Sequence, residues 1–567
     1  MMYFIGVGGT GARVAEAVIH AASSGLIEDT EIAFLFVDAD ENNGNLQRTR
    51  FSLACYKNCR DKVRRDNDPN LLWLSPAISD LGVASPVNAK EVTLGEYFQY
   101  ATMQASSKNA ADMFDLLFTS KEKNMPLSEG FRGHPSVGAA FFRDRIIFPD
   151  APKGGKDIAN GTEETINKEV NINGRAKDSQ DAWSNFIRDI QVRLKGGDNA
   201  APFKIILCGS IFGGTGASGL PSIAREIHRY LINTEIGGNR NGRDLGKIQS
   251  VLMLPYFRFD EADLDDSEKK KLFANSDDFM LNTEAALRYY EKEMKDSDGQ
   301  NILDAVYVAG SQTQLPVQAY VGRSEQNNPP HFAELFASIS IADFLSRSKD
   351  QSADKSFYTY VMEHQKQITW ADLPSSCKPL YSSALRFAFV WLADTYSELL
   401  EGNKIGTKKF LAAAPWARPF FSRDGRDKPL LDESQILLAK QIAQWSADIL
   451  RWWSAIHFFN AQGEKININD RLPKVMLFDD RCFSESICGL IGYLNIGAIN
   501  DLPTTESTHL QSLIIGDKRG NEILRNDTIK LIKDKLDRQE FRDYLSNPDK
   551  LTGIAGLAKA VYITCKV

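Results

Sequence analysis

The sequence predicts an α/β protein built on a parallel, Rossmann-like sheet. Residues 2–7 and 205–208 are short apolar runs typical of buried strands, and each run leads through glycines into a helical pattern. Residues 32–37 form a third apolar run after the first helical pattern, which completes a βαβ unit. Strands that alternate with helices in this way indicate a parallel sheet covered by helices.

The first βαβ unit carries a glycine-rich turn. Residues 6–11 read GVGGTG, which matches the G-x-G-x-x-G pattern, and an alanine-rich helix is predicted over residues 13–22. The second strand ends in the carboxylates Asp38 and Asp40. A single fingerprint of this kind fits a dinucleotide enzyme, an adenylating enzyme or another nucleotide-binding α/β fold equally well.

The next part of the chain contains helices, one loop and one polar insertion. A helical pattern covers residues 94–117, and residues 131–139 (FRGHPSVGA) combine glycine, histidine and proline as loops do. Residues from about 151 to 181 are polar, without periodicity, and predict a surface insertion. A helix is predicted over residues 182–194.

A second glycine-rich turn follows the strand at residues 205–208. Residues 212–221 read FGGTGASGLP, and an amphipathic helix is predicted over residues 220–231. Backbone N–H groups at such a junction, together with the helix dipole, favour an anion such as a nucleotide phosphate. The alternative is a tight turn that needs glycine for its geometry alone.

The same patterns predict the remaining elements. Strands are predicted at residues 251–254, 305–309 and 384–392, and a long helical region at residues 263–292. Residues 326–331 (QNNPPH) predict a helix start with asparagine at the cap and proline in the first turn, and this helix, to about residue 346, is apolar on several faces. A later long helix carries Trp445, Trp452 and Trp453, a stripe typical of a core.

Composition limits the class of protein. The chain has 567 residues, 25% charged residues and a net charge of -7, which fits a soluble globular protein of several domains and argues against direct nucleic-acid binding. Its seven cysteines include no C-x-x-C pair, so neither a zinc ribbon nor a disulfide framework is predicted. No apolar run is long enough for membrane insertion, and no signal segment is evident at residue 1, so a cytoplasmic location is expected.

These motifs, in this order, resemble the tubulin/FtsZ superfamily. Residues 212–221 resemble its GGGTG[ST]G signature, residues 6–11 its first phosphate loop, and residues 133–139 the loop that faces the terminal phosphate. Residues 279–285 (FMLNTEA) look like the stretch with a guanine-contacting asparagine, and residues 370–373 (WADL) are similar to the catalytic loop. The resemblance covers roughly residues 1–395 and is nearest to divergent bacterial tubulin-like proteins.

The resemblance implies a domain organisation. Residues 1–325 are expected to form a GTPase domain, residues 326–348 a central buried helix, and residues 349–567 an activation-type α+β second domain with a largely helical C-terminal region. It also implies a protein that assembles head-to-tail and hydrolyses GTP between subunits. Bacterial cell organisation, DNA positioning and antiviral defence are all compatible with it, as is a partner protein bound by the C-terminal region.

The resemblance further implies a set of site residues. Asp372 is expected to act on the GTP of a neighbouring subunit, and Asp38 and Asp40 to hold Mg²⁺ through water. The residues expected to contact GTP or GDP are Gly8, Gly9, Thr10, Gly11, Asp38, Asp40, Gly133, Gly138, Gly213, Gly214, Thr215, Gly216, Asn282 and Asn328.

The chain departs from the family pattern at several positions. Phe212, Ala217 and Ser218 replace signature residues, and Thr369 stands where the catalytic loop usually has its first acid. These departures leave open a nucleotide-bound scaffold that does not hydrolyse. Because residues 6–11 and 38–48 also resemble the ATP site of ubiquitin-activating enzymes, an ATP-dependent adenylating enzyme is the other alternative, although it gives residues 213–219 no role.

Overall fold

The computed structural model describes most of the chain. It leaves out residues 29, 65–70, 88–92, 128–129, 132, 146–181, 196–199, 238, 261–275, 312–313, 319–322, 347–371, 402–403, 424–425, 428–430, 463–533, 537–551 and 567. The predicted insertion at 151–181 and the first two residues of the WADL segment, Trp370 and Ala371, therefore lie outside the described residues.

Six strands form one parallel sheet, in the order β3-β2-β1-β4-β7-β9. The strand order reverses between the neighbours β1 and β4, and ligands of open parallel sheets bind beyond the carboxyl ends of the strands at such a point. The sheet confirms the α/β prediction and is compatible with a Rossmann-like domain. Its strands are β1 (Met2–Val7), β2 (Ile32–Val37), β3 (Ile78–Ala84), β4 (Phe203–Ser210), β7 (Gly246–Met253) and β9 (Ala305–Ala309).

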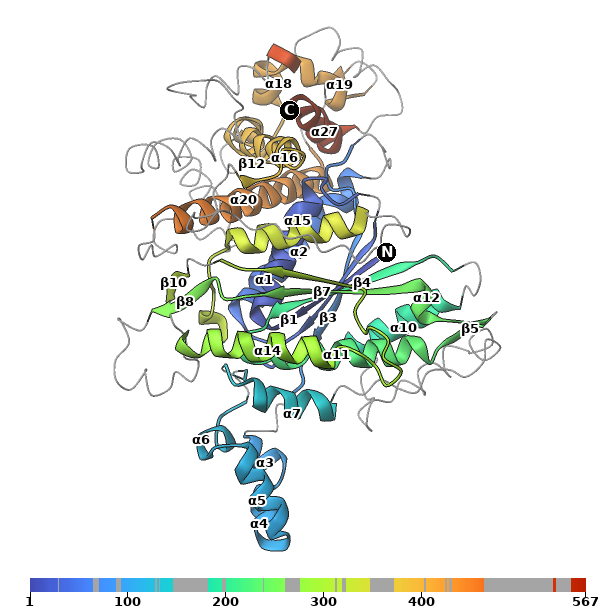
Figure 1. The fold of residues 1–567 in the computed structure, drawn as a ribbon. Coiled ribbons are helices and arrows are strands. Elements are labelled where there is room, and N and C mark those ends of the chain that lie inside the picture. Colours follow the sequence, from blue (N-terminus) through green and yellow to red (C-terminus); the bar gives the residue numbers. More distant parts are fainter. Residues whose placement is uncertain are drawn as a thin grey trace.

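Helices cover both faces of this sheet, as Figure 1 shows. Met2 and Phe4 of β1 belong to one hydrophobic core, whereas Tyr3 and Ile5 belong to the other, because successive side chains of a strand point to opposite faces. The helices on the first face are α1 (Gly8–Ser23), α2 (Gly44–Val63) and α15 (Phe332–Ser346), and those on the second include α7 (Pro135–Arg145), α10 (Ala182–Leu194) and α11 (Gly214–Ile232).

The predicted central helix is present as α15, and it is apolar and largely buried. Its predicted start was wrong: the helix begins at Phe332, after both prolines, so Asn328 is not its cap. His331 has that role instead, since its Nδ1 accepts the N–H of Ala333 at 2.9 Å and its own N–H donates to Glu334 Oε2 at 3.1 Å. Burial lowers the pKa of His331 to about 3, which keeps the ring neutral and able to accept.

The C-terminal helices pack on the face that carries α15. Residues of α16 (Lys378–Val390), α20 (Glu433–Gln462) and α27 (Gly553–Cys565) belong to the same core as α1 and α15. The strand predicted at 384–392 was wrong, because this segment is α16 and the π-helical turn Trp391–Tyr396. An apolar run buried on every side lacks the alternation that separates strand from helix. The long helix with the tryptophan stripe is confirmed as α20, with all three rings buried.

Two further predictions need correction. The helical pattern at 94–117 is three short helices, α3 (Leu94–Tyr97), α4 (Tyr100–Ser106) and α5 (Lys108–Leu117), which extend away from the sheet in Figure 1. The breaks fall where Gln99 has a φ of 53° and Ser107 is extended. In addition, the predicted loop at 131–139 is a turn followed by α7, so Gly138 is a helical residue.

The long helical region predicted at 263–292 is described only in part. The helix α14 (Phe279–Glu293) follows a short turn at Ser276–Asp278. By contrast, the strands at 2–7, 32–37 and 305–309 and the helix at 182–194 are confirmed at their predicted bounds.

Candidate functional site

The two glycine-rich turns meet where the strand order reverses. Val7 at the end of β1 pairs with Gly209 of β4, and α1 begins directly after β1 at Gly8, whereas α11 begins at Gly214, with three residues between it and β4. A Cβ placed on Gly8 would lie 3.3 Å from Cβ of Thr215. The predicted loops are therefore the first turns of two adjacent helices, which begin earlier than the sequence indicated.

Glycine is required where these turns contact the strands. A Cβ on Gly11 would lie 2.5 Å from the carbonyl oxygen of Cys208, and a Cβ on Gly216 would lie 2.2 Å from that of Ser210. Both neighbours are backbone atoms at the end of β4, which cannot rotate away as a side chain can. The glycines thus allow each helix to start against the sheet itself.

Both helix starts present unsatisfied positive charge. Neither α1 nor α11 has an acidic residue in its first turn, and neither Val7 nor Gly213, which precede them, provides a side-chain cap. The first N–H groups of a helix have no partner inside the helix, and the helix dipole adds to their attraction for anions. Gly9, Gly213 and Thr215 are partly exposed, whereas Thr10 is buried.

The two predicted metal ligands lie beyond the end of β2, and both are buried. Asp38 Oδ1 accepts the N–H of Asp40 at 3.1 Å, and Asp40 accepts the N–H groups of Asn42 (3.1 Å) and Arg323 (2.6 Å). Within the described residues no group of three or more His, Cys, Asp or Glu could hold a metal ion. Two carboxylates still fit Mg²⁺, which keeps most of its waters and needs only one or two protein carboxylates beside phosphate oxygens.

Burial is the main reason that the pKa of Asp38 rises from 3.8 to about 7, because the hydrogen bond that it accepts from the Asp40 N–H opposes the rise only in part. An acid with a raised pKa in the folded state binds more protons there than in the unfolded state. Its contribution to stability therefore falls as the pH rises from about 4 to about 7.

We therefore expect Asp38→Asn to stabilise the protein above pH 7, by at most about 4 kcal/mol, while the two proteins unfold alike near pH 4. The asparagine keeps the Oδ1 acceptor for Asp40 and removes the buried charge. Urea unfolding of both proteins between pH 4 and 8 measures the effect. Equal stability of the two proteins at pH 8 would show that Asp38 is not held in a strained ionised state.

The segment after β2, at the start of α2, contributes two residues that the site prediction missed. The amides of Asn43 and Asn45 lie next to the first glycine turn, 3.4 and 3.3 Å from a Cβ placed on Gly9. Asn43 Oδ1 accepts the N–H of Asn45 at 2.9 Å and caps α2. Their position just after the carboxyl end of a parallel strand was the signal in the sequence that could have indicated them.

The third predicted loop contacts the second glycine turn. A Cβ on Gly214 would lie 3.0 Å from the backbone of Phe131, and Gly133 has a φ of 81° in the turn that follows. Gly138 packs against Ser218, whose hydroxyl donates to the carbonyl of Gly214 at 2.6 Å. The two predicted glycines of this loop are therefore gathered beside α11, and Ser218 stabilises its first turn.

Asn282 and Phe212 join this cluster from another direction. The Asn282 amide donates to the carbonyl oxygen of Phe212 at 3.2 Å, which places the predicted base contact beside the second glycine turn. The Phe212 ring lies 4.8 Å from that of Phe279 and 5.5 Å from that of Phe257. The Phe212 ring thus anchors the turn in the core.

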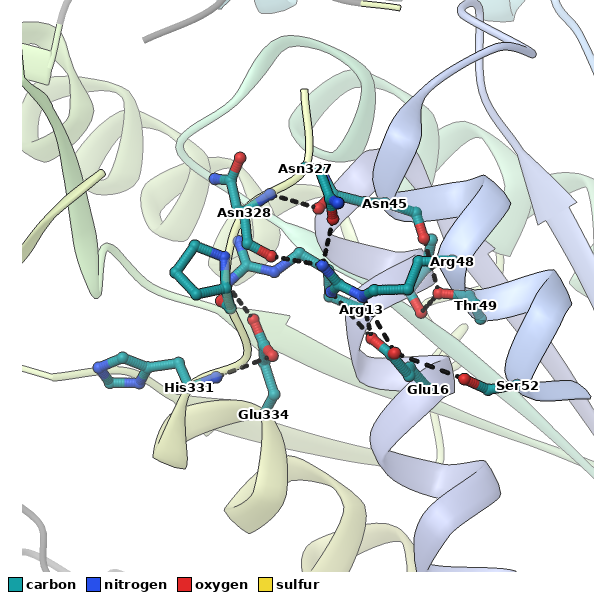
Figure 2. Close-up of polar contacts among 12 residues, drawn as sticks. Arg13, Glu16, Asn45, Arg48, Thr49, Ser52, Asn327, Asn328, His331 and Glu334 are labelled. Atoms are coloured by element: carbon teal, nitrogen blue, oxygen red, sulfur yellow. Dashed lines mark hydrogen bonds and ion pairs between the residues drawn. The ribbon is translucent and has the colours of Figure 1, made fainter. Parts of the chain in front are cut away.

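Asn328 is linked to the first glycine turn through Asn45. Its N–H donates to Asn45 Oδ1 at 2.8 Å, and its carbonyl oxygen accepts from Arg48 Nη1 at 2.7 Å (Figure 2). Arg48 also forms an ion pair with Glu16 at 2.8 Å. Asn328 is only 5% exposed, so the polypeptide itself already occupies its backbone groups.

A second buried ion pair supports the same region. Arg13 lies 2.5 Å from Glu334 and donates to the carbonyl of Pro329 at 2.8 Å, and the Tyr256 hydroxyl donates to Glu334 at 2.7 Å. Burial raises the pKa of Glu334, an effect that the Arg13 guanidinium opposes. Sequence reasoning missed Arg13, Glu16, Arg48 and Glu334; their only signal was a charged residue inside an otherwise apolar helical face.

Asp372 is not among the residues that these contacts gather around the glycine turns. It is partly exposed and lies shortly before α16. The structure thus gathers the predicted glycines, Asn282 and Asn328 at the glycine turns, and it places Asp38 and Asp40 at the end of the adjacent strand β2.

Comparison with known proteins gives no independent assignment: no protein-family model matches the chain, and no curated protein or solved structure matches it either. Among the described helices, none is both long enough and apolar enough to cross a membrane.

Proposed function

We propose that this chain is a GTP-binding protein of tubulin-like organisation, which assembles head-to-tail and hydrolyses GTP between subunits. The observation that carries the proposal is the pair of helix starts, α1 and α11, which meet between β1 and β4 without an acidic residue in either first turn. One such helix start attracts a phosphate, and two adjacent ones suit the several phosphates of a nucleoside triphosphate.

The surrounding polar groups support a complete nucleotide at this site. The side chains of Asn43, Asn45 and Asn282 offer neutral donors and acceptors on either side of the glycine turns, as recognition of a ribose and base requires. Asp38 and Asp40 are the residues that hold Mg²⁺ in this proposal, and the ion supplies charge neutralisation between phosphates. Thr215 is partly exposed and can add a hydroxyl donor to a phosphate.

The course of α15 supports a role in trans for Asp372. The helix starts near the first glycine turn, and its last carbonyls, of Phe344 and Leu345, accept from Lys204 Nζ at 2.6 and 3.2 Å. Lys204 is the second residue of β4, so α15 ends at the amino ends of the strands, opposite the glycine turns. In the proposal Asp372 orients water at the GTP of the next subunit, a heterologous contact that propagates into a filament.

Assembly-dependent hydrolysis makes a direct test possible. We expect the GTPase rate per subunit to rise with protein concentration, in step with light scattering, because each site needs a neighbour. Asp372→Ala is expected to bind GTP normally and to lose roughly a hundredfold or more of the rate, as removal of a group that orients the nucleophile does. Phosphate release at several concentrations measures both effects.

Asp343→Ala is the matched control, because Asp343 is a carboxylate within α15 and is expected to leave the rate unchanged. GTP bound without hydrolysis at every concentration would support the scaffold alternative. Preference for ATP with release of pyrophosphate would support the adenylating enzyme. In the described part of the chain, the free cysteines that such an enzyme could use as a nucleophile are all buried.

A further inference from the structure

The guanidinium group of Arg48 contacts two separate parts of the molecule, as Figure 2 shows. Nε and Nη2 point to the Glu16 carboxylate of α1, with Nε to oxygen distances of 2.8 and 3.0 Å. Nη1 points the other way and donates to the carbonyl of Asn328 and to the side chain of Asn327. The side chain is 3% exposed, so water does not compete for these bonds.

Glu16 is itself shared with the C-terminal helix α20. Arg451 Nη2 lies 3.5 Å from Glu16 and 2.9 Å from Asp448, and Glu16 is fully buried. Two guanidiniums, from α2 and α20, therefore compete for one carboxylate. Glu16 thus links Arg48 to Arg451, a residue far from it in the sequence.

The Asn327–Asn328 turn, which Arg48 holds, is connected to the first glycine turn through a single residue, Asn45. Asn328 bonds to Asn45, and the Asn45 amide lies 3.3 Å from a Cβ placed on Gly9. A shift of the Asn327–Asn328 turn must therefore move the wall of the candidate nucleotide site and leave the glycine turns on the sheet in place.

We propose that Arg48 is the positioning residue for nucleoside recognition: oriented by Glu16 and Arg451, it fixes the Asn327–Asn328 turn as the wall that contacts the nucleoside. This inference rests on the proposed function of the site. It also gives the C-terminal region a role in nucleotide selection, because α20 sets the orientation of Arg48 without touching the nucleotide itself.

Binding of GTP and binding of inorganic tripolyphosphate, measured on the same variant, distinguish a positioning role of Arg48 from a merely structural one. Arg48→Lys keeps the charge and loses the planar fork that serves both partners. We expect its affinity for GTP, with Mg²⁺, to fall at least roughly tenfold, the loss of about one charge-assisted hydrogen bond. Its affinity for inorganic tripolyphosphate should stay unchanged, because the glycine turns alone bind that probe. Equilibrium binding to the full chain measures both constants.

Arg451→Lys is the second variant, because it leaves the Arg48–Glu16 pair intact and tests the contribution of α20. Its affinity for GTP should also fall, and its affinity for tripolyphosphate should stay unchanged. Arg288→Lys, on an exposed pair with Glu284, is the matched control and should change neither.

The outcomes are distinct. If Arg48→Lys lowers the affinities for GTP and for tripolyphosphate equally, Arg48 has a merely structural role and the inference is overturned. An unchanged GTP affinity in Arg451→Lys would overturn the part played by α20. If the wild-type chain binds tripolyphosphate but gains nothing from the nucleoside, the inference fails while anion binding stands. If it binds neither probe, the proposed function itself fails.

Discussion

Replacing Gly216 by alanine is expected to abolish GTP binding. The added Cβ would lie 2.2 Å from the carbonyl oxygen of Ser210 and 2.8 Å from its nitrogen, both in the backbone at the end of β4. No rotamer change relieves this contact, so the first turn of α11 must move away from the sheet. Its N–H groups then leave the positions next to α1, and we expect a loss of affinity of roughly a hundredfold or more, equivalent to about 2.7 kcal/mol.

The same substitution should lower the free energy of unfolding by about 1–3 kcal/mol, as overpacking of a tight contact does. Gly299→Ala is the control, because Gly299 has a φ of 77° and a Cβ there would meet nothing within 4 Å. This variant should lose about 1–2 kcal/mol of its free energy of unfolding, because alanine is unfavourable in a left-handed backbone conformation. It should bind GTP normally. A Gly216→Ala protein that binds GTP as tightly as the wild type would show that the turn does not contact phosphate.

Replacing Glu16 by alanine is expected to have the largest effect on stability. The carboxylate is fully buried and pairs with both Arg48 and Arg451. Without it, two buried guanidiniums lose their common partner and Arg48 keeps only the Asn327–Asn328 turn. Removing one partner of a buried ion pair costs about 3–5 kcal/mol, because the remaining charge stays desolvated. Urea unfolding of both proteins at neutral pH measures the difference.

Glu284→Ala provides the comparison on the surface. The Glu284 and Arg288 side chains are 61% and 72% exposed, so we expect their loss to change the free energy of unfolding by less than about 0.5 kcal/mol. Unfolding of Glu16→Ala at the wild-type urea concentration would contradict a paired, buried carboxylate. The buried pair Arg13–Glu334 predicts the same kind of loss for Glu334→Ala.

Much of the sheet was predictable because its signals are local. β1, β2 and β9 are short apolar runs between turns, and their bounds agree with the sequence patterns. The starts of α1 and α11 were not predictable in this way, since glycine has a low helix propensity and only contact with the sheet makes it helical there. The segment at 384–392 failed for a related reason, because burial on every side removes the periodicity.

The candidate site likewise contains some residues that the sequence indicates and others that it does not. Its glycines, Asp38 and Asp40 stand at strand ends that the sequence marks, whereas the partners of Arg13 and Arg48 come from the turn before α15 and from α15 itself. Charge pairs between such distant segments leave no pattern in a single sequence. The departure Phe212 also became interpretable only when its aromatic neighbours were placed around it.

The central claim is that the two glycine turns together bind a nucleoside triphosphate. Calorimetric titration of the wild-type chain with GTP in the presence of Mg²⁺ tests it most directly, with Gly216→Ala and Gly299→Ala titrated alongside. The account predicts one GTP bound per chain, displaced by GDP, retained in Gly299→Ala and lost in Gly216→Ala. No heat of binding from GTP, GDP or tripolyphosphate, with a chain that is folded by circular dichroism, would contradict it.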